Sequence, residues 1–445
     1  MINETSVAKP KPDSHKRLKK SFDKINKELI KPILDEEKLS IQEKLLCLLS
    51  LKSCVTDDCY VLHIVSDDRN ETYRLFAVLN DRGKTLSDGE LLRSRTLELL
   101  EGHLILQNGV ESYWDEILSG TPSQISDFLV SYFPSHVGER AAKRDIFDDY
   151  CKKFFNYSTS CLKSESEAKS VEQRVANMRD EYNTFSKIRE GEWVYENPTV
   201  CDWDRQRLYR LVKILKHTLC FPLLISIHTC LSEDIFSETV NLLERFVFRY
   251  ITVVGARADS LSDIYHEHAT EIRQNPKKYK LAKLEDDLSK LAAEKAPDSV
   301  FQVNLIEKLR YSDDSTRKRL VKHFLTTLED YHNWFSNGAA GKPKPSKIST
   351  YDINQLSIEH IYPQKAKVKI PLLEAYINNI GNLSFWAPGE NREASNDVFD
   401  IKKPLYQKSS IRMNRELANI AEWNEQQFKN REEKLVKMAL KLFAF

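Results

Sequence analysis

The sequence has 445 residues, of which 41% are hydrophobic and 30% charged, with a formal net charge of +1. This composition is typical of a globular protein long enough for two or three buried cores. Because the net charge is close to zero, the chain as a whole is not a polycation, and any nucleic-acid-binding surface must be local.

The cysteines and the apolar stretches limit the cellular setting. Eight cysteines are present and none forms a CxxC pair. Together with the expectation that no signal peptide is present, this favours reduced thiols over disulfides or a zinc cluster. The longest apolar stretch, around Leu219–Ile227, is too short to span a bilayer. We therefore expect a cytoplasmic protein without membrane contact.

The N-terminal region begins with a polar tail. Residues 1–14 contain Lys9-Pro10-Lys11-Pro12 and few apolar side chains, which predicts a flexible tail. From His15 to about Leu34 the apolar residues recur at helical spacing among many lysines. This pattern predicts a basic amphipathic helix.

A distinctive turn follows at Asn80-Asp81-Arg82-Gly83, where Gly83 is expected to have a positive φ. Ser87 is a suitable N-cap for the next helix, and Glu90 stands at the capping-box position three residues later. Taken alone, this run is a junction between two helices.

The rest of the chain divides by composition. Residues 106–335 are a series of amphipathic helical patterns, which predict a helical domain. Residues 336–349 are rich in Gly, Ser, Pro and Lys and are expected to be a linker. Residues 350–445 differ again, with strand-like segments ending near Ile361 and Trp386 and a long amphipathic helix at 422–443. The predicted fold class is mainly α.

The chemistry-bearing residues lie in this last region. Glu359-His360-Ile361-Tyr362-Pro363-Gln364 is followed by Gly381-Asn382-Leu383 and then by Asn391. Phosphodiester hydrolysis needs an activated water, and histidine can accept its proton near neutral pH. A hard divalent cation that stabilises the phosphate prefers oxygen ligands of the kind that Glu359 and Asn391 offer. Neighbouring side chains of a regular strand point to opposite faces, so a shared site requires Glu359 and His360 at a strand end or bulge.

This arrangement resembles the HNH or His-Me-finger ββα-metal nucleases, and more narrowly the C-terminal nuclease domain of GmrSD-type modification-dependent restriction enzymes. The resemblance implies a small ββα-metal nuclease element within residues 350–445. Further positions support it: Asn396, Lys402, Tyr406, Ser409, Trp423, Arg431 and Leu435.

Site roles follow from the resemblance. It implies that His360 is the general base, that Glu359 and Asn391 bind Mg²⁺ or Mn²⁺, and that Asn382 orients the loop or His360. Glu359 stands where many such nucleases have the shorter Asp, and its extra methylene would shift the metal or require a bridging water. Four lysines are expected either to contact backbone phosphates or to form a solvated surface: Lys365, Lys367, Lys402 and Lys403.

A second resemblance concerns residues 15–105. The run from Phe76 to Ser87 resembles the segment that closes the N-terminal ParB-like domain of GmrSD-type proteins. The NTPase motifs of that domain, a Tyr-Gln-Arg-type run and Asp-Gly-Gln-Gln-Arg, are absent from this sequence. We therefore interpret 15–105 as a remnant of that domain and expect no NTP hydrolysis by this chain. Either a separate subunit supplies the NTPase core, which we favour, or the chain is a shortened relative.

The expected function is that of a metal-dependent DNA endonuclease subunit in a GmrSD-like restriction or anti-phage defence system. The preference for DNA, and for modified DNA, is implied by the resemblance. A dimer would provide the two sites needed to cut both strands. Two alternatives remain open: a non-catalytic helical interaction subunit that binds nucleic acid, and a toxin-like RNase.

Overall fold

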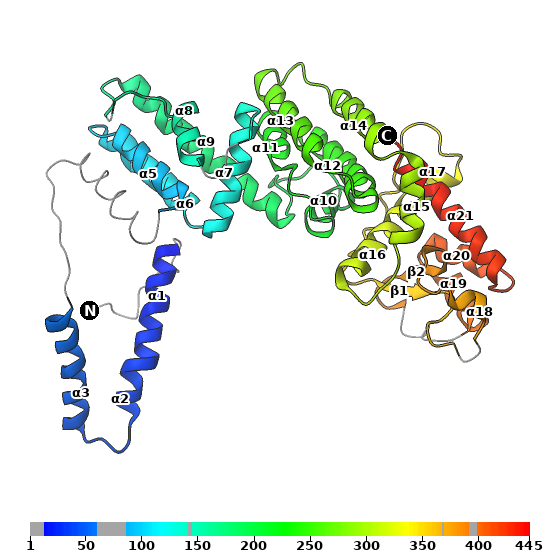
Figure 1. Ribbon diagram of the computed structural model, residues 1–445, viewed down its shortest axis with the longest axis horizontal. Coiled ribbons are helices and arrows are strands. Elements are labelled where there is room, and N and C mark those ends of the chain that lie inside the picture. Colours follow the sequence, from blue (N-terminus) through cyan, green and yellow to red (C-terminus); the bar gives the residue numbers. More distant parts are fainter. Residues whose placement is uncertain (1–12, 60–85, 141–144, 160, 367–368, 391–397) are drawn as a thin grey trace. The chain divides into compact units, whose positions relative to one another are not determined.

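The computed structural model describes residues 13–59, 86–140, 145–159, 161–366, 369–390 and 398–445 (Figure 1). In these residues it is dominated by helices and contains one two-stranded antiparallel sheet near the C-terminus. This confirms the predicted mainly α fold. The chain divides into two compact units, Met1–Phe133 with Glu139–Asn183, and Pro134–Gly138 with Thr184–Phe445.

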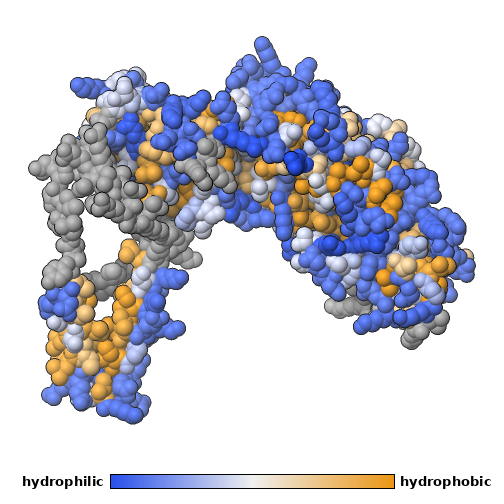
Figure 2. All heavy atoms as spheres, in the orientation of Figure 1, coloured by the Kyte–Doolittle hydropathy of each residue, from blue (hydrophilic) through white to orange (hydrophobic). Residues whose placement is uncertain are grey.

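The described part of the first unit begins with a helical hairpin. Its helices are α1 (Asp13–Ile25), α2 (Lys31–Asp35) and α3 (Ile41–Ser53), with π-helical turns at Asn26–Ile30 and Cys54–Asp58. A capping box between Ser40 and Glu43 fixes the start of α3. Large apolar side chains remain exposed along both arms, and Figure 2 shows hydrophobic residues gathered on both of them. These residues are Leu18, Phe22, Ile25, Leu29, Leu34, Ile41, Leu45, Leu46, Leu49 and Val55.

Among the described residues, the helices that follow are α5 (Asp88–Leu99), α6 (Leu104–Ile117), α7 (Pro122–Val137), α8 (Ile146–Lys153) and α9 (Glu165–Glu190). The predicted capping box at the start of α5 is confirmed. The Glu90 nitrogen donates to Ser87 Oγ at 3.4 Å, and the Ser87 nitrogen donates to Glu90 Oε2 at 2.8 Å. The Asn-Asp-Arg-Gly turn at 80–83 lies outside the described residues.

The second unit contains a helical part, with helices α10 (Asp202–Tyr209), α11 (Phe221–Cys230), α12 (Glu233–Val247), α13 (Asp259–Gln274), α14 (Leu281–Lys295), α15 (Asp298–Lys308), α16 (Ser315–Asp330) and α17 (His332–Ser336). π-Helical turns extend α10 over Arg210–Ile214 and α12 over Phe248–Val254. Among the described residues, none of the helices has both the length and the apolar character needed to cross a bilayer.

A buried ionic cluster joins α10, α12 and α16. Arg207 pairs with Asp330 at 3.0 Å and with Glu244 at 3.4 Å. His323 lies 2.8 Å from Glu244 Oε1. Burial by itself would raise the pKa of Glu244, but Arg207 and His323 lower it to about 2. The three helices are therefore joined by buried charges, and removal of one charge would leave its partner buried and unpaired.

The C-terminal elements are β1 (Ser357–His360), α18 (Pro371–Glu374), β2 (Leu383–Trp386), α19 (Phe399–Lys408), α20 (Arg412–Ala418) and α21 (Glu425–Leu442), with a 3₁₀ turn at Ile380–Asn382. Helix α16 contacts β2 and α21, and α20 contacts β2. One apolar cluster links these elements: Ile361, Tyr362, Leu373, Trp386, Phe399, Tyr406, Leu417, Trp423 and Phe428. The small sheet is thus embedded among helices.

Candidate functional site

The two strands form a short antiparallel ladder. Glu359 lies opposite Ser384, and His360 lies opposite Leu383. Arg431 of α21 donates a hydrogen bond to the Leu383 carbonyl at 3.0 Å. This contact ties the C-terminal helix to β2, so the helix helps to fix the strand that pairs with Glu359 and His360.

Gly381 allows α21 to approach the start of β2 closely. A β-carbon at this position would lie 2.8 Å from Cε2 of Phe428 and 2.8 Å from Cβ of Glu432. Both atoms belong to the helix and would have to move if a side chain were present. The glycine of the Gly-Asn-Leu motif is therefore required by close packing.

Asn382 clamps the turn that follows β1. Its Oδ1 accepts hydrogen bonds from the Tyr362 nitrogen at 2.8 Å and from Trp423 Nε1 at 3.2 Å. Its Nδ2 donates to the carbonyls of Tyr362 at 3.0 Å and Ile377 at 2.9 Å. The amide thus uses its full hydrogen-bonding capacity within the protein. This geometry suits a residue that orients the loop.

His360 is the last residue of β1 and only 8% of its surface is exposed. Its Nε2 lies 3.3 Å from Oδ1 of Asn378, and the ring of Tyr311 packs edge-on at 4.6 Å between centroids. Burial lowers the pKa of His360 to about 4, with a smaller contribution from the charge of Lys402. The imidazole is therefore neutral at pH 7 and has one ring nitrogen able to accept a proton.

Glu359 is buried on the neighbouring position of the strand, at 5% exposure. Its Oε1 lies 2.7 Å from Nζ of Lys402 and accepts a hydrogen bond from the Tyr406 hydroxyl at 2.8 Å. The same Nζ donates to the carbonyl oxygen of His360 at 2.7 Å. Tyr406 is held in turn by parallel stacking on Trp386, 5.2 Å between ring centroids.

The described residues do not fit a metal site at β1. Glu359 contacts side chains of α19, whereas His360 contacts Tyr311 and Asn378, as expected for successive positions of a regular strand. Within the described residues, no group of three or more His, Cys, Asp or Glu side chains could hold a metal ion. Asn391, the other expected ligand, lies outside those residues.

The C-terminal region of the chain, which contains β1 and β2, matches a known protein family. Residues 295–438 match the family of GmrSD restriction endonucleases, C-terminal domain. The chain carries a GmrSD-type C-terminal domain. The matched family is one of restriction nucleases, as the resemblance of the Glu-His and Gly-Asn-Leu motifs implied. A comparison with curated proteins finds no match.

The GmrSD-type domain begins well before the sheet and includes α15 and α16. Glu329, in the last turn of α16, accepts hydrogen bonds from the backbone nitrogens of Arg412 at 2.8 Å and Met413 at 3.1 Å. It thereby satisfies free donors at the start of α20, which contacts β2. The helices that precede residue 336 thus help to position the sheet.

The four lysines expected to contact DNA phosphates differ in their exposure and in their partners. Lys365 is exposed. Lys403 is half-buried, and its Nζ donates to the Ala421 carbonyl at 3.3 Å. Lys402 is 1% exposed, with its ammonium held by Glu359, and contact with phosphate would require that ion pair to open. Lys367 lies outside the described residues.

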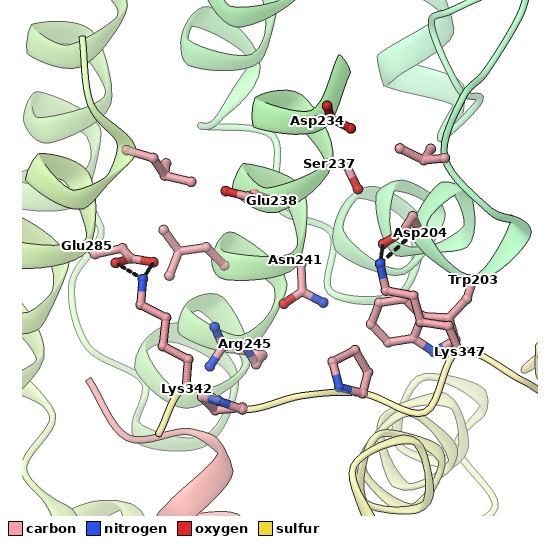
Figure 3. A pocket seen from close by; sticks show the side chains of 15 residues that line it. Trp203, Asp204, Asp234, Ser237, Glu238, Asn241, Arg245, Glu285, Lys342 and Lys347 are labelled. Carbon is pink, nitrogen blue, oxygen red and sulfur yellow. Dashed lines mark hydrogen bonds and ion pairs between the residues drawn. The ribbon is translucent and has the colours of Figure 1, made fainter. Parts of the chain in front are cut away.

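A separate pocket of about 500 Å³ lies in the second unit, beside residues 342–347 (Figure 3). Lys342 pairs with Glu285 at 2.6 Å and Lys347 pairs with Asp204 at 2.7 Å, so two ion pairs fasten this segment along the pocket. The pocket is lined by residues other than those of β1 and β2. It therefore does not belong to the Glu359–His360 site.

Sequence reasoning missed two neighbours of the expected base. Tyr311 precedes α16, and Asn378 lies in the loop before the Gly-Asn-Leu motif, yet both contact His360. Neither carries a local signal, because the contacts arise from packing between distant segments. Lys402 and Tyr406 are among the positions that support the resemblance, but their pairing with Glu359 is visible only in the structure.

Proposed function

We propose that this protein is a cytoplasmic DNA endonuclease subunit of a GmrSD-like restriction or anti-phage system, and that His360 is the general base that activates water. The observation that carries this proposal is a buried, neutral imidazole at the end of β1, inside the matched restriction-nuclease domain. The preference for DNA, including modified DNA, rests on the family.

The environment of His360 supports a proton-accepting role. When Nε2 donates its hydrogen to Asn378 Oδ1, Nδ1 has a free lone pair. The Tyr311 ring packs against the imidazole at an interplanar angle of 85° and restricts it from one side. The Asn382 clamp fixes the turn directly after His360, which keeps the base in place. A base held in one orientation is one requirement of general base catalysis.

A divalent cation, Mg²⁺ or Mn²⁺, is the cofactor that the resemblance implies. The described residues do not assemble its ligand set, and no step of the proposed mechanism is assigned to it. Its requirement is tested directly by adding EDTA to a plasmid-cutting reaction and then restoring Mg²⁺ or Mn²⁺. We expect cutting to stop and to return with the metal. Cutting that continues in excess EDTA contradicts a metal-dependent activity.

Plasmid nicking tests the proposed reaction. The wild-type protein is expected to nick plasmid DNA, and His360→Ala is expected to lower the rate by at least 10²-fold. His332→Ala is the control, because His332 belongs to the same domain but pairs with Glu416 and not with Asn378 or Lys402. Both variants are checked by thermal unfolding. If wild type does not cut even with a partner, NTP and modified DNA, a non-catalytic nucleic-acid-binding subunit is favoured. His360-dependent cutting of RNA alone would indicate an RNase.

We also propose that a separate NTPase subunit binds the N-terminal helices. The sequence lacks the NTPase motifs of the family it resembles. The α1–α3 hairpin exposes large apolar side chains on both arms, including Phe22 and Leu45. An apolar surface of this kind is typical of a binding site for another protein. We also propose that the protein forms a dimer, which would provide the two sites needed to cut both DNA strands.

A further inference from the structure

Glu359, the expected metal ligand, already forms an ion pair with Lys402. Both side chains are almost fully buried, at 5% and 1% exposure. The Lys402 ammonium lies 2.7 Å from Glu359 Oε1 and 2.7 Å from the carbonyl oxygen of His360. The same carboxylate oxygen also accepts a hydrogen bond from the Tyr406 hydroxyl at 2.8 Å. One oxygen of Glu359 thus already binds a cation and a hydrogen-bond donor.

This arrangement opposes a divalent cation at that oxygen. A metal ion there would have to displace the ammonium or share a buried carboxylate with it, and two cations at such short range repel each other strongly. The displaced Lys402 would then be left buried without a counter-ion, which is itself unfavourable. Tyr406, fixed by stacking on Trp386, keeps the carboxylate turned toward α19.

We propose that Glu359 is the counter-ion of Lys402 and not a metal ligand, and that Lys402 is a positioning residue that holds the backbone of His360 from α19. Lys402 supplies the positive charge beside the Glu359 carboxylate and the His360 carbonyl. It fixes the carbonyl of the residue whose imidazole is the proposed base, so α19 and β1 are joined at the reacting end of the strand. The inference depends on the proposed function only for its kinetic readout.

A double-mutant cycle tests the pair in the whole chain without reference to catalysis. Glu359→Gln and Lys402→Met each leave one buried charge unpaired, and each is expected to lower the unfolding midpoint by roughly 6–12 °C. The double variant removes both charges and is expected to recover at least half of the summed loss. The matched control is the exposed pair Lys437–Glu433, where Lys437→Met and Glu433→Gln should change the midpoint by about 1 °C or less. Additive losses in the Glu359–Lys402 cycle overturn the pairing.

Titration with Mn²⁺ alone, in the wild type and the variants, tests the metal part. If Glu359 is not a ligand, Glu359→Gln and Lys402→Met should each change the apparent Mn²⁺ dissociation constant by less than about threefold, and complete absence of binding in all four proteins gives the same conclusion. Tenfold weaker binding in Glu359→Gln, or tenfold tighter binding in Lys402→Met, overturns the inference.

The kinetic readout separates positioning from general stability. For nicking, Lys402→Met is expected to lower kcat at least tenfold with KM nearly unchanged, and to move the acidic limb of the pH profile upward, because a positive charge near His360 is lost. The unfolding and Mn²⁺ experiments remain decisive if the wild-type protein does not cut. That result would contradict the proposed function without affecting the ion pair. An unchanged kcat and pH limb in a folded Lys402→Met protein contradicts the positioning role.

Discussion

The side-chain oxygen of Asn382 accepts a hydrogen bond from the backbone nitrogen of Tyr362 at 2.8 Å, while its amide nitrogen donates to the carbonyl of the same residue. One side chain therefore replaces two backbone contacts and closes the turn after β1. The indole of Trp423 approaches the same oxygen, so the start of β2, the turn and the segment before α21 meet at Asn382.

The first prediction concerns this clamp. Asn382→Ala leaves several buried polar groups unpaired, and we expect the free energy of unfolding to fall by about 2–4 kcal/mol. Denaturant unfolding followed by circular dichroism measures the change. Asn430→Ala is the control, because Asn430 is exposed and bonded only to Gln426 in its own helix, and it should change stability by less than about 0.5 kcal/mol. Equal effects of the two substitutions would show that the clamp contributes little.

The second prediction concerns pH. A general base works in its neutral form, and burial lowers the pKa of His360 from its usual value to about 4. We therefore expect kcat/KM for nicking to be flat from pH 8 to about pH 5 and to fall at lower pH as the imidazole is protonated. An acidic limb near pH 6.5 would contradict this environment for the base.

Stability must be measured in the same pH series. A histidine with a lowered pKa in the folded state binds a proton first in the unfolded chain, so its native stabilisation is present above pH 6.5 and is lost as the pH falls toward 4. His217 is buried beside Tyr265 and its pKa is likewise lowered to about 4 by burial. His217→Gln should therefore reduce the pH dependence of unfolding between pH 6.5 and 4, while the limb for nicking stays in place.

The third prediction concerns DNA contact by the exposed lysine. Lys365→Ala is expected to weaken binding to DNA of any sequence and to reduce the slope of log affinity against log salt by about 0.9. Filter binding at several salt concentrations gives this slope. Lys437→Ala is the control, because Lys437 pairs with Glu433 within α21. An unchanged slope in Lys365→Ala would show that Lys365 belongs to a solvated surface.

The fourth prediction concerns the partner. Phe22→Asp with Leu45→Asp places charges on the exposed apolar face of the hairpin, and we expect these changes to abolish co-purification with an NTPase subunit encoded by a neighbouring gene. Lys52→Asp, in the same helix as Leu45, is the control and should retain binding. Retained binding in the double variant would contradict a docking role for this face. If the double variant instead turns a homodimer into monomers, the partner of this face is a second copy of the chain.

The sequence was informative where its signals are local. The capping box at Ser87 and Glu90 formed as predicted, because a cap needs only residues three positions apart. The two short strands, expected near Ile361 and Trp386, are present as β1 and β2. The GmrSD-type match over 295–438 agrees with the resemblance inferred from the Glu-His and Gly-Asn-Leu motifs.

The composition, the mainly α character and the motif that relates this chain to restriction nucleases were thus determined by the sequence itself. Only the tertiary structure decided what surrounds each side chain of that motif. Glu359 and His360 are adjacent in the chain, but the alternation of β1 sends one to Lys402 and the other to Tyr311 and Asn378. Burial, ion pairing and a lowered histidine pKa depend on atoms from distant segments, and no spacing along the chain encodes those distances.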